Sequence, residues 1–235
     1  MLAAAAPAAG AAAAGADDLL GRPLALVVAL ALVSLLPFVF MSTTAFVKIS
    51  TVLQIVRSAI GAQSVPSNTV VMALAAALTL LAMAPTGQKI IDRAAPLFDA
   101  KHTPDTVTLV REGLDAVKEP MREFFEANTS AREKARFFEV ARASRPEPQR
   151  AEVKANDLPV LIPAFVVTEL TEAFAIGFLL FLPFLVIDLV VSNVLLSLGM
   201  QMLNPTQVSL PFKLLLFVGI DGWGLLAQAL VAGYH

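Results

Sequence analysis

Seven ionisable residues lie within or beside long apolar stretches of the sequence, where charged side chains are rare. They are Lys48, Arg57, Glu169, Glu172, Asp188, Lys213 and Asp221. A charge in hydrocarbon costs several kcal/mol, so such side chains usually face protein or water and pair with one another. This set therefore predicts buried ion pairs.

Glu169 and Glu172 are three positions apart and share one face of a helix, where like charges repel unless a cation is near. Lys213 is the candidate cation, because it stands in the last apolar run. An alternative for Lys213 is that its ammonium group reaches the membrane surface while its stem stays in apolar surroundings. The same alternative fits Glu169 less well, since apolar sequence lies on both sides of it.

Asp188 and Asp221 raise the question of an intramembrane aspartyl protease, which uses two aspartates. Asp221 lies in Gly-Ile-Asp-Gly-Trp-Gly, which lacks the Gly-x-Gly-Asp motif of those enzymes. The small residues around it favour close helix packing instead. His102 and His235 are isolated and make no metal site, and no phosphate-binding loop or nucleophile motif is present. We expect no catalytic residue, no cofactor and no metal.

Met200, Gln201 and Met202 form a short corner between two apolar runs. Gly199 before them and Pro205 after them mark this corner as a loop. Methionine is flexible and polarizable, so it fills irregular gaps. The two methionines therefore fit either ordinary core packing or a soft seal that opens and re-forms.

The composition defines the elements that must position these residues. The chain has 235 residues, of which 57% are hydrophobic and 15% charged, against about 25% charged in a typical soluble domain. Residues 86–157 hold 26 of the 36 charged residues. This distribution predicts an integral membrane protein with one soluble insertion. The net charge of -2 and the lack of a basic cluster argue against nucleic acid, and the absence of cysteine excludes disulfides.

The predicted organisation has four parts. Residues 1–22 are an Ala-rich leader with no basic start of the kind a secretory signal has. Residues 23–85 form hydrophobic helices, among them an amphipathic helix that Gly61 ends. Residues 86–157 form the soluble insertion, and residues 158–235 form a hydrophobic hairpin region.

Capping signals inside the insertion predict two or more short helices. Thr103-Pro104 is typical of a helix start, and Ser130 with Glu133 fits a capping box. Pro120 should bend one of these helices.

The run from 158 to 203 is long enough to form a single helix of about 70 Å, over twice the hydrocarbon thickness of a bilayer. We therefore expect it to bend, with Pro163, Gly177 and Pro183 as candidate positions. The apolar runs lack the period-two alternation of a membrane barrel. The predicted fold class is all-α: a membrane protein of helical hairpins with a soluble helical insertion.

Two long stretches resemble a known family. Residues 163–223, PAFVVTELTEAFAIGFLLFLPFLVIDLVVSNVLLSLGMQMLNPTQVSLPFKLLLFVGIDGW, closely resemble the FliP/SctR family of type III secretion export-gate subunits. Residues 46–85 look like the N-terminal signature of that family. The short N-terminus and the motif DLVVSN are more similar to the virulence (injectisome, YscR/HrcR-like) branch than to the flagellar one. The leader and the insertion carry no resemblance.

The resemblance implies a function without enzymatic activity. Family members assemble as about five copies with a small two-helix subunit and one larger pore subunit. This assembly forms the pore through which unfolded protein substrates cross the bacterial inner membrane. In the family the hydrophobic segments form helical hairpins held largely above the bilayer plane, and the resemblance implies that the insertion lies in the periplasm.

The resemblance also assigns roles to particular residues. It places an intersubunit charge pair on Glu169 and Lys213. It gives Glu172 no role, because an acid is not expected there.

In the corner between the two last apolar runs, the resemblance places a pore gasket on Met200, Gln201 and Met202, with Gly199 and Pro205 as its hinges. Gln201 departs from the methionine often found in the family, which weakens the seal because an amide is more easily wetted than a thioether.

Two other functions stay open at this stage. A solute or ion transporter would also carry buried charges and broken helices, but we find no internal repeat between residues 23–85 and 158–235 of the kind that such proteins have. A membrane scaffold without a pore would differ from an export gate by lacking a central channel lined by residues 199–205.

Overall fold

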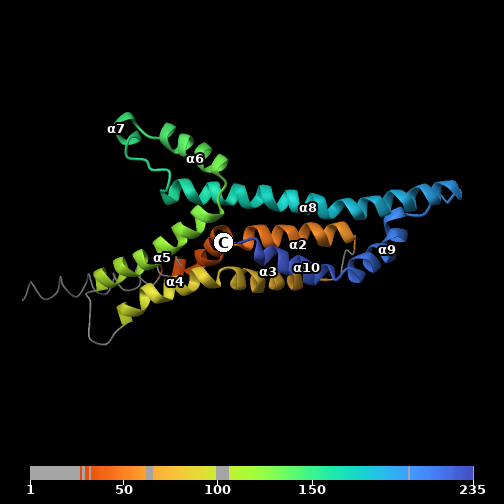
Figure 1. Ribbon diagram of the computed structural model, residues 1–235, viewed down its shortest axis with the longest axis horizontal. Coiled ribbons are helices and arrows are strands. Elements are labelled where there is room, and N and C mark those ends of the chain that lie inside the picture. The colour runs from red at the N-terminus through yellow and green to blue at the C-terminus, as the bar shows by residue number, and fades with distance from the viewer. Residues whose placement is uncertain are drawn as a thin grey trace, which may run out of the picture. The chain divides into compact units, whose positions relative to one another are not determined.

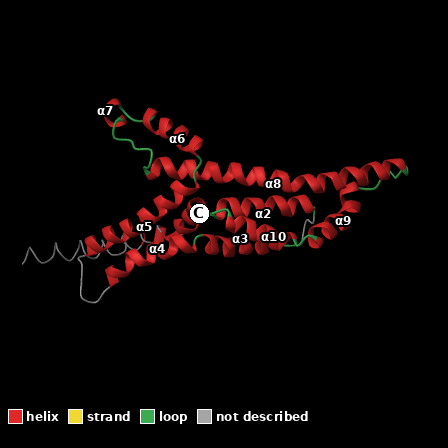
Figure 2. Cartoon of the chain, viewed as in Figure 1, coloured by secondary structure: helices red, strands yellow, loops and turns green. Residues whose placement is uncertain are grey.

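The computed structural model describes residues 27, 30–31, 33–61, 66–98, 106–200 and 202–234. These described residues form helices and loops, with no strand among them (Figure 2). The chain divides into two compact units, residues 1–41 and 42–235. The predicted leader, residues 1–22, lies outside the described residues. In the first unit the described residues from Val33 onward are helical and expose their apolar side chains.

In the second unit, helix α2 spans Phe46–Ile60 and carries a buried apolar stripe. Gly61 ends the helix in the left-handed conformation at φ 80°, and its N–H donates to the carbonyl of Ser58. The prediction of an amphipathic helix ended by Gly61 is confirmed.

Two helices meet at an angle in the next stretch. Helix α3 spans Asn68–Ala82, and its N-terminus is capped by Ser67, whose hydroxyl accepts the N–H of Val70. Helix α4, Ala84–Ala94, follows at once, and the two axes differ by 57° where the 3-10 turn η1 (Ala95–Phe98) is counted with α4.

The charged region contains three helices: α5 (Thr106–Asn128), α6 (Ala131–Ala143) and the short α7 (Glu147–Arg150). The Ser130 hydroxyl caps α6 by accepting the N–H of Glu133, which confirms the predicted cap. The carboxylate of Glu133 pairs with an arginine of the same helix, so the reciprocal half of the capping box is replaced by an ion pair.

Helices α4 and α5 are joined by charges at the surface. Glu123 of α5 binds Lys89 at 2.8 Å and Arg93 at 3.2 Å, both on α4. Pro120 lies inside α5 and does not end it. The predicted start at Thr103-Pro104 lies outside the described residues.

Helix α8, Leu158–Ser197, is a single helix of 40 residues, about 60 Å long at 1.5 Å per residue. Pro163, Gly177 and Pro183, where we expected bends, all lie inside this one helix, so none of them ends it. Each proline removes one backbone hydrogen bond from the helix. Packing of α2 along α8 supports the helix in spite of this loss (Figure 1). Gly177 serves this packing, because a Cβ at its position would lie 2.5 Å from the Ile55 side chain. The chain turns only after Ser197.

The last apolar run folds into α9, Pro205–Gly219, and α10, Gly222–Ala232, whose axes differ by 58°. Helix α9 packs back on α8 to form a hairpin, and α10 packs on α3 (Figure 1). The last apolar run is thus divided into two helices near Asp221.

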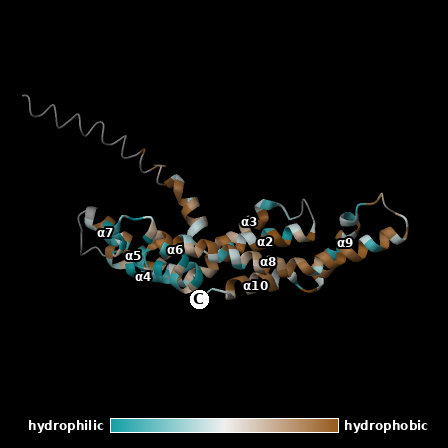
Figure 3. Ribbon diagram, turned by 90° about the horizontal axis from the view of Figure 1, so that it is seen from above, coloured by the Kyte–Doolittle hydropathy of each residue, from teal (hydrophilic) through white to brown (hydrophobic). Residues whose placement is uncertain are grey.

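Two hydrophobic cores stabilise the second unit. The larger joins α2, α3, α8, α9 and α10. The smaller joins α5 to the first turns of α8 through Phe124, Phe125, Leu161 and Phe165. Apolar residues dominate α2, α3, α8 and α10, whereas α4 to α7 are largely hydrophilic (Figure 3).

Among the described residues, α8 is the one helix long and apolar enough to cross a membrane by itself, and up to four spans result if each of three bent helix pairs counts as one. The predicted fold class, an all-α membrane protein, is confirmed.

Candidate functional site

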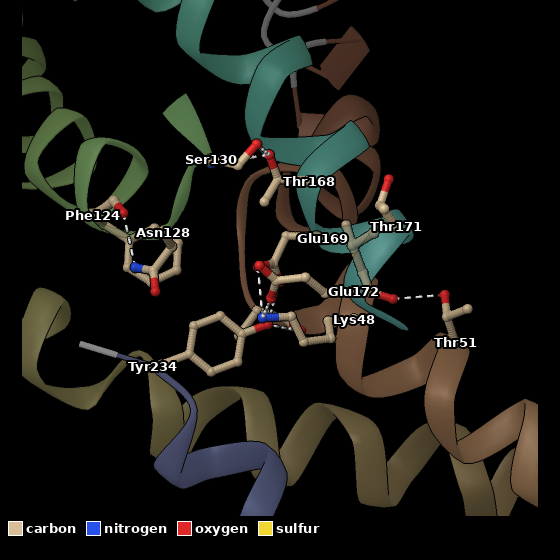
Figure 4. Close-up of polar contacts among 12 residues, drawn as sticks. Lys48, Thr51, Phe124, Asn128, Ser130, Thr168, Glu169, Thr171, Glu172 and Tyr234 are labelled. Atoms are coloured by element: carbon tan, nitrogen blue, oxygen red, sulfur yellow. Dashed lines mark hydrogen bonds and ion pairs between the residues drawn. The ribbon is translucent and has the colours of Figure 1, made fainter. Parts of the chain in front are cut away.

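A buried lysine holds the two glutamates of α8. The Nζ atom of Lys48 on α2 lies 3.0 Å from Oε1 of Glu169 and 2.7 Å from Oε2 of Glu172 (Figure 4). The side chain of Glu169 is fully buried, that of Lys48 is 7% exposed, and that of Glu172 is 51% exposed. One cation therefore serves two carboxylates, of which one faces solvent. This contact also explains the presence of Glu172, which the sequence left without a role.

The second oxygen of Glu169 is bound by the C-terminal end of the chain. The hydroxyl of Tyr234 donates to Oε2 of Glu169 and also lies 3.3 Å from the carbonyl oxygen of Ala45. The Nζ atom of Lys48 lies 4.5 Å from the centre of the Tyr234 ring, within cation–π range. Oε1 of Glu169 accepts no hydrogen bond within the described part of the chain, so its contact with Lys48 is an ion pair alone.

The turn between α5 and α6 lies next to this cluster. The N–H of Ser130 donates to the Thr168 hydroxyl at 3.2 Å, and that hydroxyl in turn donates to the Ala164 carbonyl at 2.8 Å. The ring of Phe124 stacks on Tyr234 at 6.0 Å between centroids (Figure 4). The soluble insertion therefore contacts the residue before Glu169 and the residue that binds Glu169.

A second polar cluster links α8 to α9 within their hairpin. Lys213 of α9 is 2% exposed, and its Nζ atom lies 2.7 Å from Oδ2 of Asp188 on α8. The same Nζ donates to the Ala59 carbonyl of α2 at 3.2 Å. Oδ1 of Asp188 accepts the hydroxyl of the buried Ser209 at 2.5 Å. These contacts tie three helices together.

Within one chain, Lys213 is therefore the partner of Asp188, and Lys48 is the cation between Glu169 and Glu172. Inside a single chain Lys213 lies against Asp188 and not against the two glutamates, because α9 packs beside the later part of α8. A pair between Glu169 and Lys213 of different copies stays a prediction.

Sequence reasoning missed the role of Lys48, although a signal was available. Lys48 lies on the same helix face as Ala45, Ile49 and Val52, all of them buried. A lysine inside such a stripe predicts a buried partner. Tyr234 gave no comparable signal, because it follows the end of α10.

The loop between α8 and α9 begins with a Schellman motif. The N–H of Met200 donates to the Leu195 carbonyl and that of Gly199 to the Leu196 carbonyl, with Gly199 at φ 73°. Met200 is 44% exposed and Met202 is 99% exposed. Met202 therefore does not fill the core of this chain.

Gln201 and Pro205 are the other two residues that the sequence analysis assigned to this loop. Gln201 lies outside the described residues. Pro205 begins α9, whose first turn is capped by the Asn204 side chain at 3.0 Å from the Thr206 nitrogen.

Asp221 forms the tight junction between α9 and α10. It adopts φ 51°, and its carbonyl accepts the N–H of Leu225. A Cβ at Gly224 would lie 2.5 Å from the Asp221 carboxylate, and one at Gly222 would lie 2.4 Å from the Phe217 ring. The small residues permit close packing here, as predicted.

The remaining residue of the set, Arg57, donates from Nε to the Pro66 carbonyl at 2.8 Å and so supports the connection between α2 and α3. Among the described residues no group of three or more His, Cys, Asp or Glu side chains could hold a metal ion.

Comparison with known proteins gives consistent matches over nearly the whole chain. The model of the FliP family matches residues 29–230. The "Hypersensitivity response secretion protein HrcR" of Ralstonia nicotianae is 45% identical over 89% of this chain and 96% of its own length. The "Yop proteins translocation protein R" of Yersinia pestis is 40% identical, over 89% and 95%. The "Flagellar biosynthetic protein FliP" of Bacillus subtilis is 40% identical, over 89% and 90%.

The virulence-related relatives agree with the branch that the motif DLVVSN indicated. Since the family model covers residues 29–230 and the relatives align along nearly their full length, the chain belongs to the FliP family.

Proposed function

We propose that this chain is a core subunit of a type III secretion export apparatus of the injectisome branch. The observation that carries the proposal is the match over nearly the full length to proteins named for secretion, translocation and flagellar biosynthesis. The helical hairpins and the charged insertion are the architecture that the resemblance implies.

The chain exposes apolar surface that an assembly would cover. A wholly apolar groove of about 470 Å³ lies between α8 and α9. It is lined by Val186, Ile187, Val190, Val191, Val194, Leu195, Val208 and Phe212. Apolar patches of this kind mark protein or membrane contacts. We propose that this apolar surface is covered in an assembly of about five copies of this chain with the small two-helix subunit and the larger pore subunit.

The loop between α8 and α9 supplies the proposed gasket. Met200, Gln201 and Met202 from several copies would form a ring that closes the pore at rest. The exposure of Met202 supports this assignment, since a side chain that is 99% exposed in the single chain can meet other copies. Gly199 and Pro205 bracket the loop as hinges.

Charge balance supports a contact between Glu169 and Lys213 of neighbouring copies. The cluster around Lys48 has two carboxylates and one cation, so another positive charge would balance it. Lys213 is buried against Asp188 in the single chain. Assembly would therefore have to move Lys213 away from Asp188 or share it.

We propose that the chain resides in the bacterial inner membrane, with the insertion of residues 86–157 in the periplasm. A reporter enzyme that is active only outside the cytoplasm, fused near the exposed Ala143, should be active. Activity of a cytoplasm-only reporter at the same position would overturn this topology.

Electron microscopy of the complex purified from membranes tests the function itself. An export gate should show a central channel lined by residues 199–205, and deletion of the chain should stop secretion of substrate proteins. An assembly in which residues 199–205 surround no central channel, open or closed, would favour a scaffold. A chain that transports a solute when reconstituted alone would favour a transporter.

A further inference from the structure

Tyr234, two residues beyond the end of α10, packs against both hydrophobic cores of the second unit. Among the described residues, Met83 is the other partly buried one that packs against both cores. The two cores otherwise consist of different buried residues. The C-terminal end of the chain therefore lies at the joint between the hydrophobic helices and the soluble insertion.

The contacts of Tyr234 come from three helices and one turn. Its ring stacks on Phe124 of α5 and lies under the ammonium group of Lys48 on α2. Its hydroxyl donates to Glu169 of α8 and lies near the carbonyl of Ala45 before α2. Figure 4 shows the ring of Tyr234 beside the Lys48 and Glu169 side chains. A single side chain thus touches the insertion and both members of the buried ion pair.

The insertion meets α8 at a second point close by. Ser130, between α5 and α6, donates from its N–H to the Thr168 hydroxyl, and the two hydroxyl oxygens are 3.3 Å apart. Thr168 precedes Glu169 in α8. The stack of Phe124 on Tyr234 and the contact of Ser130 with Thr168 therefore both hold the insertion close to Glu169.

We infer that Tyr234 is a positioning residue, a C-terminal latch that fixes the soluble insertion against α8 and aims the Glu169 carboxylate at Lys48. The ring packs against both cores, and the hydroxyl donates to Oε2 of Glu169 while Lys48 pairs with Oε1. A buried carboxylate oxygen that loses its donor is destabilised. The latch is a property of the single chain and does not depend on the export function.

The two parts of the side chain can be separated by substitution. Tyr234→Phe keeps the stacking on Phe124 and the contact with Lys48 but removes the hydroxyl. Tyr234→Ala removes both. The latch predicts a graded effect on the docking of the insertion, with the alanine variant affected more.

The absence of cysteine from the chain allows a direct test. Ser130→Cys with Thr168→Cys places two thiols where hydroxyl oxygens now lie 3.3 Å apart, so a disulfide should form when the insertion is docked. We would measure the rate of disulfide formation in the full chain, in native membranes, after addition of a mild oxidant. The expected rate falls about ten-fold with Tyr234→Ala and about two- to three-fold with Tyr234→Phe.

Two controls make the outcome decisive. Phe178→Ala removes an exposed aromatic ring from α8 that contributes to neither core and should leave the rate unchanged. A second cysteine pair, Gln54→Cys with Met72→Cys, reports on the packing of α2 against α3, where the ends of the native side chains are 3.7 Å apart. Because cysteine is shorter than glutamine and methionine, this pair would be closed with a flexible bifunctional maleimide. That pair should close at the parental rate in every Tyr234 variant. The latch is refuted if Tyr234→Ala leaves the Ser130–Thr168 rate unchanged, or slows both pairs equally.

Discussion

Replacing Lys48 by methionine should destabilise the chain more than removal of any exposed ion pair of the insertion. The substitution keeps the length of the side chain but deletes the cation that lies 3.0 Å from the fully buried Glu169. It also leaves Glu172 three positions away on the same helix face, where the two carboxylates repel.

The size of the effect follows from the geometry. Two unit charges 3.0 Å apart attract by about 5 kcal/mol at an effective dielectric constant of about 20, before desolvation is counted. Removing one member of a buried pair costs about 3–5 kcal/mol, because the other charge is left uncompensated. The half-exposed Glu172 adds little, since exposed pairs contribute about 0–1 kcal/mol. We expect a loss of about 3 kcal/mol for Lys48→Met.

A double-mutant cycle is the assay. Unfolding of detergent-solubilised chain would be followed for Lys48→Met, Glu169→Gln and the double variant, with Lys89→Met as the matched control at an exposed pair. The double variant should regain most of the stability lost by Lys48→Met, because the amide leaves no buried charge. The control should lose at most about 1 kcal/mol. A loss below about 1 kcal/mol for Lys48→Met, or no recovery in the double variant, would show that the pair is not buried as described.

Three further predictions concern the hairpin and the insertion. Lys213→Ala should prevent recovery of the full oligomer on native gels, since it leaves Asp188 without its cation at the foot of the α8–α9 hairpin; a normal oligomer yield would contradict this. Replacing Met200 and Met202 together with glycine should leave assembly intact but raise the single-channel conductance of the resting complex, because an apolar constriction blocks ions by dewetting; unchanged conductance in an assembled complex would reject the gasket. The hydrogen bond from Lys89 and the positive charges of Lys89 and Arg93, both on α4, hold the pKa of Glu123 below its ordinary value. A carboxyl group whose pKa is lowered by folding stabilises the folded state at pH values above its unfolded-state pKa. This stabilisation is lost as the pH falls through the folded-state pKa. The stability difference between the parent and Glu123→Gln should therefore be present at neutral pH and vanish in acid; a difference that persists below the pKa of Glu123 would exclude this origin.

Local chemistry explains what could be predicted correctly. The Ser130 cap and the Gly61 stop were predicted because each depends on residues within a few positions along the chain. The separation of a charged insertion from apolar runs was visible because it depends on composition. The continuity of α8 through Pro163 and Pro183 was not foreseen, since it depends on helices that pack against α8 from elsewhere in the chain.

The sequence by itself determined that this is a helical membrane protein of the FliP family and that its rare buried charges must find partners. Only the tertiary structure decided which partners they find: Lys48 for the two glutamates, Asp188 for Lys213, and Tyr234 for the remaining oxygen of Glu169. The physical reason is that a charge in apolar surroundings demands compensation wherever it lies, but any nearby opposite charge can supply it. The choice depends on how α2, α8, α9 and the C-terminal end pack together, and packing over such long separations in the chain leaves no periodic signal in the sequence.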